Sequence, residues 1–223
     1  MALDVRLKLA MIRKSLGKFS DWGIKRLYRS SVIATIEGVP IVSARDDHDD
    51  FLRIISRSFD LLRTHDLRRF QRVVSTADWI VDCSLPLGAR TGLYRPRFSS
   101  IEMDFDYSEE FGDELYHAGY YAGLLVHEGT HELLFKRGFE YSEETRIQEE
   151  RICVAEENRF LARLDIVRDN LGHSLQREFD ASNWHQYWSM KRGQIFKEHI
   201  KRIRQKERQG EQSVPPKSDR AGG

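Results

Sequence analysis

The chain has 223 residues, of which 40% are hydrophobic and 32% are charged, and its formal net charge is only +1. This length and composition are typical of a chain that buries one substantial core. The charge balance excludes a bulk attraction to nucleic acid, so no specific nucleic-acid partner is predicted. No apolar run reaches transmembrane length, and no uninterrupted apolar segment precedes a cleavage site. Because Cys83 and Cys153 alone do not make a disulfide framework, we expect a cytoplasmic protein.

The first predicted element is an amphipathic basic helix over residues 4–28. Its apolar side chains recur at helical spacing between lysines and arginines, at Val5, Leu9, Ile12, Leu16 and Phe19. A helix of this type more often docks on its own domain. Contact with an anionic membrane surface is the alternative.

Strand patterns and one helix pattern follow. Residues 31–43 are rich in Val and Ile and are broken by Glu37-Gly38, which predicts a strand with a turn. Asp47 to Thr64 predicts a helix with aspartates at its N-terminal end, where the helix dipole favours them. From Phe70 to Met103, short β-rich runs alternate with proline and glycine, which predicts a small sheet.

Three further helices are predicted in the second half of the chain. They cover Asp113–Phe135, with a stop at Gly138, then Ser142–Val167, and then a basic segment over residues 182–209. Residues 210–223 have the composition of a disordered tail. No repeat or linker is visible, so we predict one α+β domain over residues 1–209. In this domain a small sheet packs on two successive helices, with further helices at both ends.

The most informative segment is His127-Glu128-Gly129-Thr130-His131, which lies in an apolar helical stretch. Residues four apart share one face of a helix, so both imidazoles can bind one ion, and Glu128 can reach a water on that ion. Neutral imidazoles bind Zn²⁺ without cancelling its charge, and a carboxylate can take the proton of the acidified water. A chance match is the alternative, but unpaired polar groups among Leu, Val and Ala are costly to bury. The segment therefore predicts a zinc site.

A catalytic zinc site needs a third protein ligand and keeps one position open. The metzincin pattern is excluded, because Leu134 and Arg137 stand where that pattern has Gly and His. The remaining source is a glutamate from the next helix. That helix offers Glu149, Glu150, Glu156 and Glu157.

Helical phase places two of these glutamates on the inward face. Glu150 and Glu157 share a face with apolar side chains three, four and seven positions apart, namely Cys153, Val154, Leu161 and Leu164. Glu150 is the preferred ligand because it lies 150 − 131 = 19 positions after His131. Glu157 is then the residue that orients a histidine. The exchange of these two roles stays open.

The other two glutamates lie about 100° away on the helix. Arg146 precedes Glu149 by three residues and Arg159 follows Glu156 by three, so both glutamates are predicted to form solvated ion pairs. Arg146 also lies four residues before Glu150. For this reason Glu149 stays open as an alternative third ligand.

The motif helix followed by a glutamate-bearing helix resembles the gluzincin division of zinc metallopeptidases, over about residues 100–165. The resemblance implies a zincin-like domain in which a small sheet accompanies two such helices. It also implies that His127, His131 and Glu150 bind zinc and that Glu128 is the general base. The chain differs from the thermolysin-like pattern, since no Asn precedes Glu150 and no Asp lies four residues after it.

Amide hydrolysis also needs a hydrogen-bond donor for the developing oxyanion. In gluzincins this is often Tyr or His, and Tyr141 is the nearest candidate because it lies between His131 and the glutamate helix. Weaker candidates are His117, His173, His185 and Tyr187. The segment Ile101–Phe105 is predicted as an edge strand against which an extended peptide could pair.

These residues favour a metallopeptidase that uses zinc to hydrolyse a peptide or protein substrate. Two alternatives stay open. One is a zinc amidohydrolase that acts on a non-peptide amide, and the other is a non-catalytic, zinc-containing binding or regulatory module. A closed site of four ligands would favour the module, with Cys153, one turn after Glu150, as the fourth ligand.

Overall fold

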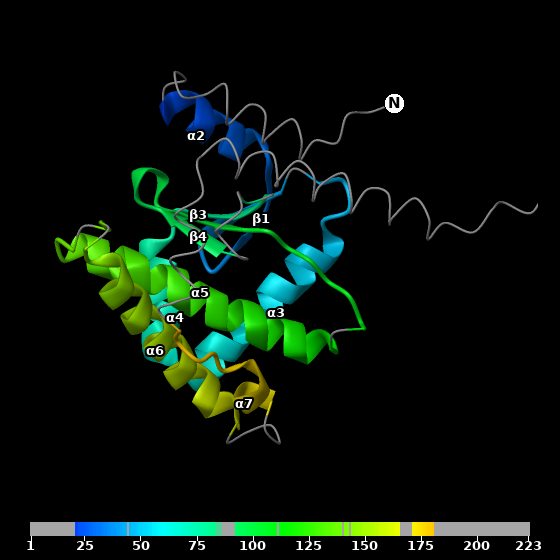
Figure 1. The fold of residues 1–223 in the computed structure, drawn as a ribbon. Helices are drawn as coiled ribbons and strands as arrows, with labels where there is room; N and C mark the ends of the chain where they lie inside the picture. The colour runs from blue at the N-terminus through cyan, green and yellow to red at the C-terminus, as the bar shows by residue number, and fades with distance from the viewer. Residues whose placement is uncertain are drawn as a thin grey trace, which may run out of the picture.

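A computed structural model describes residues 21–43, 45–83, 85, 92–110, 112–139, 141–142, 144–165 and 171–180. The predicted α+β class is confirmed, with helices lying on both sides of one sheet (Figure 1). The predicted helix over residues 182–209 and the tail after it lie outside the described residues. In chain order the elements are α2 (Asp21–Ser30), β1 (Val32–Ile36), β2 (Val39–Ser43), α3 (Asp49–His65), α4 (Leu67–Thr76), β3 (Trp79–Asp82), β4 (Gly92–Arg95), the 3₁₀ turn η2 (Pro96–Phe98), β5 (Ser100–Met103), α5 (Glu114–Lys136), α6 (Arg146–Asp165) and α7 (Leu171–Leu175).

The five strands form a mixed sheet with the order β1-β2-β3-β5-β4. Strands β2, β3 and β5 run parallel, whereas β1 and β4 pair antiparallel with their neighbours at the two ends. Glu37 and Gly38, between β1 and β2, have φ angles of 51° and 83°. Such left-handed pairs suit the twist of a two-residue hairpin. The predicted turn at these residues is confirmed.

The edge strand predicted over Ile101–Phe105 is wrong, because β5 lies between β3 and β4. Its side chains are buried on both faces of the sheet, as an interior strand requires. The chain reverses at Ser99, which has a left-handed φ of 47°. Strand β4 therefore lies outside β5 and is the edge strand at this end of the described sheet.

The stretch around Phe70, predicted as part of the sheet, is instead the helix α4. Asp66 caps its first turn by accepting a hydrogen bond from the amide of Arg69 at 3.2 Å. Phe70 and Val73, three residues apart, then enter the main core on one helical face. The β-forming side chains of this segment are thus used in a helix, where burial outweighs their local preference.

The motif helix α5 has the boundaries that the sequence predicts. Asp113 caps its start by accepting from the amide of Tyr116 at 2.8 Å. At its end Gly138 has a φ of 83°, and the amide of Phe139 donates to the carbonyl of Leu134, which is the Schellman termination. Helices α3, α4 and α6 pack around α5. Its central turns are therefore buried.

Helix α2 covers the opposite face of the sheet (Figure 1). Tyr28 packs with Val81 and Phe98 in a second apolar cluster, and its hydroxyl donates to Glu102 Oε1 at 2.5 Å. The predicted basic helix over residues 4–28 is described only from Asp21 onward, and this part docks on the chain's own sheet.

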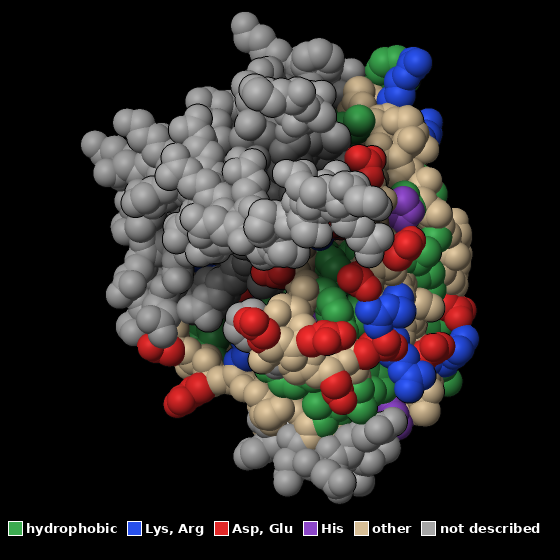
Figure 2. All heavy atoms as spheres, turned by 90° about the vertical axis from the view of Figure 1, so that its right-hand side faces the viewer, with side chains coloured by type: hydrophobic (Ala, Val, Ile, Leu, Met, Phe, Trp, Pro, Cys, Tyr) green, Lys and Arg blue, Asp and Glu red, His purple; other side chains and the backbone are tan. Residues whose placement is uncertain are grey.

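The surface of the described helices carries mixed charges. Figure 2 shows acidic and basic side chains lying next to one another on one face of the molecule. Arg53 of α3, for example, pairs with Asp50 and with Glu114. Among the described helices, none has both the length and the apolar character needed to cross a membrane.

Candidate metal centre

The centre of α5 presents His127 and His131 on one face, one helical turn apart. Their ring centroids are 5.1 Å apart, and both side chains are almost completely buried. Leu125 and Val126, which precede His127, are buried in the main core and hold this part of the helix in place. The two histidines therefore face the neighbouring helix α6 rather than solvent.

Helix α6 brings Glu150 to both histidines. Its Oε2 lies 3.2 Å from Nε2 of His127, and its Oε1 lies 3.6 Å from Nε2 of His131. The carboxylate thus bridges the Nε2 atoms of the two histidines. Two turns later on α6, Glu157 Oε2 lies 3.1 Å from Nδ1 of His127, on the other side of the ring.

Glu157 has a second partner that the sequence did not indicate. Arg177, which follows α7, places Nη2 2.8 Å from Glu157 Oε1. Arg177 lies 20 positions after Glu157 (177 − 157 = 20) and in no recognisable motif. Its contribution depends on the fold of the segment around α7, and no local signal could have identified it.

Cys153 also lies at this centre. His127, His131 and Cys153 each offer one donor atom, and these atoms lie within 4.8 Å of one another. The thiol is fully buried. Within the described part of the chain these three residues form a group that can hold a metal ion. The sequence indicated Cys153 only as a conceivable fourth ligand.

The solvated position predicted for Glu149 is wrong, because only 3% of this residue is exposed. Its Oε2 lies 3.9 Å from Nδ1 of His131. Arg146, on the same turn of α6, is buried as well. The first turns of α6 bury more of the helix circumference than the stripe of apolar side chains indicates. Helical phase alone therefore could not show that Glu149 is buried like Glu150. The predicted pair of Glu156 with Arg159 is present.

Glu128, between the two histidines, contacts the sheet edge. Its Oε2 accepts a hydrogen bond from the amide of Tyr94 on β4 at 2.8 Å. Burial raises the pKa of the Glu128 carboxyl, while the charges of His127 and His131 oppose this shift. Gly92 lies on β4, two residues before Tyr94, and a Cβ added there would lie 2.7 Å from Glu128 Oε1. The edge strand β4 therefore lies against this carboxylate.

Tyr141 lies against the same centre. Its hydroxyl donates to Glu150 Oε1 at 2.7 Å, and its ring centroid is 5.6 Å from that of His131. Although 42% of the residue is exposed, partial desolvation of the hydroxyl and the neighbouring Glu150 raise the pKa of its phenol. Tyr141 is therefore a neutral donor at physiological pH.

Of the weaker candidates, His117 does not join this group. His117 is instead hydrogen-bonded through Nε2 to the carbonyl of Ser108 at 2.9 Å. His173 belongs to α7. His185 and Tyr187 lie outside the described residues.

The charges at the centre favour a bound cation. Burial alone would lower the pKa of His127, but its hydrogen bonds with Glu150 and Glu157 outweigh burial and raise it to about 10. Burial alone would raise the pKa of Glu150, but His127 and His131 hold it below its usual range. These shifts show carboxylates that stabilise positive charge at the histidines. Two imidazoles with a carboxylate or a thiolate also form a donor set that suits zinc.

The structure thus brings together His127, His131, Glu128, Glu150 and Glu157, with Tyr141 and Cys153 beside them. Among these residues His127, His131 and Cys153 make up a candidate metal-binding group. No protein-family model, curated protein or solved structure matches the chain.

Proposed function

We propose that the chain is a zinc-dependent hydrolase in which His127, His131 and Glu150 bind the metal and a water attacks a peptide bond. The observation that supports this proposal most is the position of Glu150, whose two oxygens lie 3.2 Å and 3.6 Å from the Nε2 atoms of the two histidines. Two histidines and one carboxylate are a known ligand set of catalytic zinc, which leaves a coordination position for water.

A zinc ion bound by these residues would lower the pKa of its water to about 7 and would polarise the substrate carbonyl. Glu128 supplies the base: it takes the proton of the attacking water and passes it to the leaving amine. Its hydrogen bond from the Tyr94 amide restrains the carboxylate without neutralising it. Glu157 holds His127 through Nδ1, which orients Nε2 toward the metal.

Tyr141 is the proposed donor to the oxyanion that forms on the substrate carbonyl. Its phenol is neutral and lies beside His131 and Glu150. Donation to the substrate requires the hydroxyl to leave Glu150 Oε1. In the absence of substrate, Tyr141 therefore restrains the proposed third ligand.

A peptide is the proposed substrate class because β4, the edge strand of the described sheet, borders the centre. Strand β4 is antiparallel to β5 and contacts Glu128 through Tyr94. An extended peptide that adds to an exposed strand edge is held by its main chain, whereas a small non-peptide amide has no use for such an edge. This difference favours a peptidase over the alternative zinc amidohydrolase.

The test is the digestion of a broad peptide library, read by mass spectrometry. Wild-type protein, Glu128→Gln and a chelator-treated sample are compared, and metal analysis is carried out on each. Wild type should contain about one zinc per chain and should cleave. Glu128→Gln should keep its zinc and lose activity by about 10²–10⁴-fold. Equal cleavage by wild type and Glu128→Gln would contradict the proposed mechanism.

A second candidate function is a non-catalytic zinc module, which the position of Cys153 favours. Its sulfur lies within 4.8 Å of donor atoms of both histidines, and a thiolate ligand is frequent in closed structural sites. X-ray absorption at the zinc edge distinguishes the two functions. A sulfur ligand at about 2.3 Å that is lost in Cys153→Ser indicates the module, whereas only nitrogen and oxygen ligands at about 2.0–2.2 Å indicate the hydrolase.

A further inference from the structure

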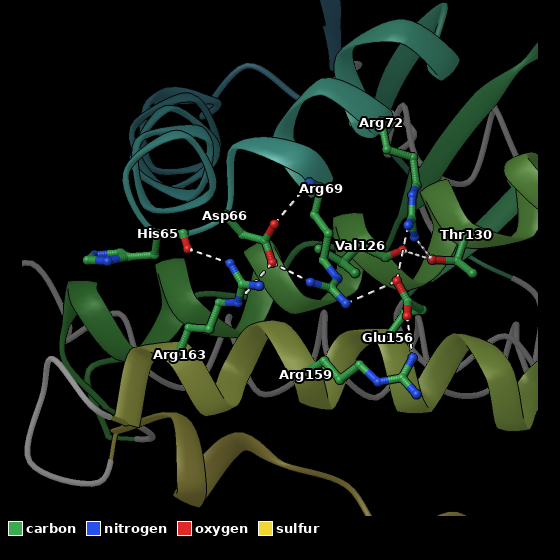
Figure 3. A network of polar contacts seen from close by, with 9 residues as sticks. All are labelled: His65, Asp66, Arg69, Arg72, Val126, Thr130, Glu156, Arg159 and Arg163. Carbon is green, nitrogen blue, oxygen red and sulfur yellow. Dashed lines mark hydrogen bonds and ion pairs between the residues drawn. The ribbon is translucent and has the colours of Figure 1, made fainter.

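Behind the metal centre, charged side chains that are largely shielded from solvent join α4 to α5 and α6 (Figure 3). Arg69 and Arg72, both on α4, each donate to Glu156 Oε2 on α6 at 3.1 Å. The other oxygen of Glu156 accepts from Arg159. Burial alone would raise the pKa of Glu156, but Arg159, Arg69 and Arg72 outweigh burial and lower it. Glu156 is therefore an anion that holds both arginines of α4.

The two arginines differ in their second partner. Arg72 also reaches α5, where its Nη1 donates to Thr130 Oγ1 at 2.9 Å. The Thr130 hydroxyl donates in turn to the carbonyl of Val126 at 2.7 Å, so it accepts from Arg72 through a lone pair. The second partner of Arg69 is Asp66, the residue that caps its own helix. One guanidinium thus links the two helices of the metal centre, and the other does not.

The partners of Arg72 occupy particular positions. Thr130 immediately precedes His131, and Glu156 immediately precedes Glu157. Neighbouring residues on a helix are rotated by about 100°, so a contact that fixes one side chain also fixes the direction of the next. The guanidinium is a planar, rigid fork, which makes it suited to hold two groups in one geometry.

We propose that Arg72 is a positioning residue of the metal centre. Through Thr130 and Glu156 it holds α5 and α6 at the rotation and separation at which His131 faces the ion and Glu157 faces Nδ1 of His127. Arg72 lies on α4 and acts by holding the backbones of α5 and α6 relative to one another. This inference rests on the proposed function, since it requires a metal at the centre.

Arg69 provides a matched control for the test. Both arginine side chains are 8% exposed, and both bind the same oxygen of Glu156 at the same distance. Substitution by lysine keeps the charge of each and removes the fork. Arg72→Lys and Arg69→Lys are therefore compared with wild type in the full chain. The measurements are zinc affinity by competition with a chromophoric chelator, the visible absorption of the cobalt-substituted protein, and the melting temperature.

Both variants should lose a similar amount of thermal stability. Arg72→Lys alone should bind zinc about tenfold more weakly, the low end for groups beyond the metal ligands, and should change the cobalt spectrum. Equal affinities and superimposable spectra for the two variants would overturn the inference and leave the proposed function intact. A wild-type chain that binds neither metal would overturn both.

Thr130 supplies a second pair of variants. This pair tests the positioning role of Arg72 if Arg72→Lys does not fold. Thr130→Ser keeps the hydroxyl that accepts from Arg72, whereas Thr130→Val keeps the shape and removes the acceptor. The serine variant should retain the wild-type zinc affinity and cobalt spectrum. The valine variant should show the weaker affinity and the altered spectrum. Equal zinc affinities and equal cobalt spectra for the valine and serine variants would contradict the role of Arg72.

Discussion

The Glu157 carboxylate lies 3.1 Å from Nδ1 of His127, whereas Glu150 contacts Nε2 on the opposite side of the imidazole ring. A carboxylate at Nδ1 accepts a hydrogen bond from the N–H group there, and this tautomer leaves the lone pair of Nε2 free to bind a metal. The seven-residue step between Glu150 and Glu157 is two turns of one helix. A single helix thus supplies both the proposed ligand and the residue that orients the histidine.

Glu157→Gln tests this orienting role. The amide keeps the size of the side chain but is a weaker acceptor for the proton on Nδ1, so zinc affinity should fall by about 10–100-fold. Glu109→Gln, at an exposed position, is the matched control and should bind zinc as wild type does. The affinities are measured by chelator competition. Equal affinity in both variants would show that Glu157 does not orient the histidine.

The third ligand is tested by comparing Glu150→Ala with Glu149→Ala. Glu150 lies 3.2 Å from His127 Nε2, whereas Glu149 approaches only Nδ1 of His131, at 3.9 Å. We therefore expect Glu150→Ala to lose most of its zinc and Glu149→Ala to lose much less. Elemental analysis after dialysis measures the difference. A dominant loss in Glu149→Ala would reverse the assignment.

Gly92→Ala tests the contact between β4 and Glu128. The added Cβ would lie 2.6 Å from Leu124 Cδ1 and 2.7 Å from Glu128 Oε1, so the carboxylate must move from its place beside the Tyr94 amide. A displacement of the base by about 1 Å should lower kcat by about 10²-fold, with zinc affinity unchanged because the ligands are not touched. Leu93→Ala is the control, since Leu93 packs on the opposite face of the sheet. Unchanged kcat in Gly92→Ala would show that the contact does not place the base.

Glu156→Gln should change how stability depends on pH. The pKa of Glu156 is lowered in the folded chain, so its stabilising contribution is complete above the usual glutamate pKa of about 4.3 and is lost as pH falls through the lower folded value. The variant should therefore be less stable than wild type at neutral pH, and the difference should shrink below about pH 4. Urea unfolding at several pH values measures it, and a difference that stays constant down to acidic pH would argue against an ionised Glu156.

Local sequence patterns predicted those elements whose ends are fixed by residues close to them in the sequence. The turn at Glu37-Gly38 and the span of α5 from Asp113 to Gly138 are present because left-handed glycines and capping aspartates act within a few residues. The helix around Phe70 was missed. Its β-forming residues reflect intrinsic preference, whereas the main core that decided its structure is built by distant segments.

The sequence by itself determined that His127 and His131 share a face, because 3.6 residues per turn sets that relation inside one helix. It also placed Glu150 and Glu157 on a common face of α6. Only the tertiary structure decided that Glu149 is buried, that β4 rather than β5 is the edge strand beside Glu128, and that Arg72 links Thr130 to Glu156. Each of these depends on how one element is rotated against another. That rotation is set by packing between segments far apart in the chain, which no periodicity within a single segment contains.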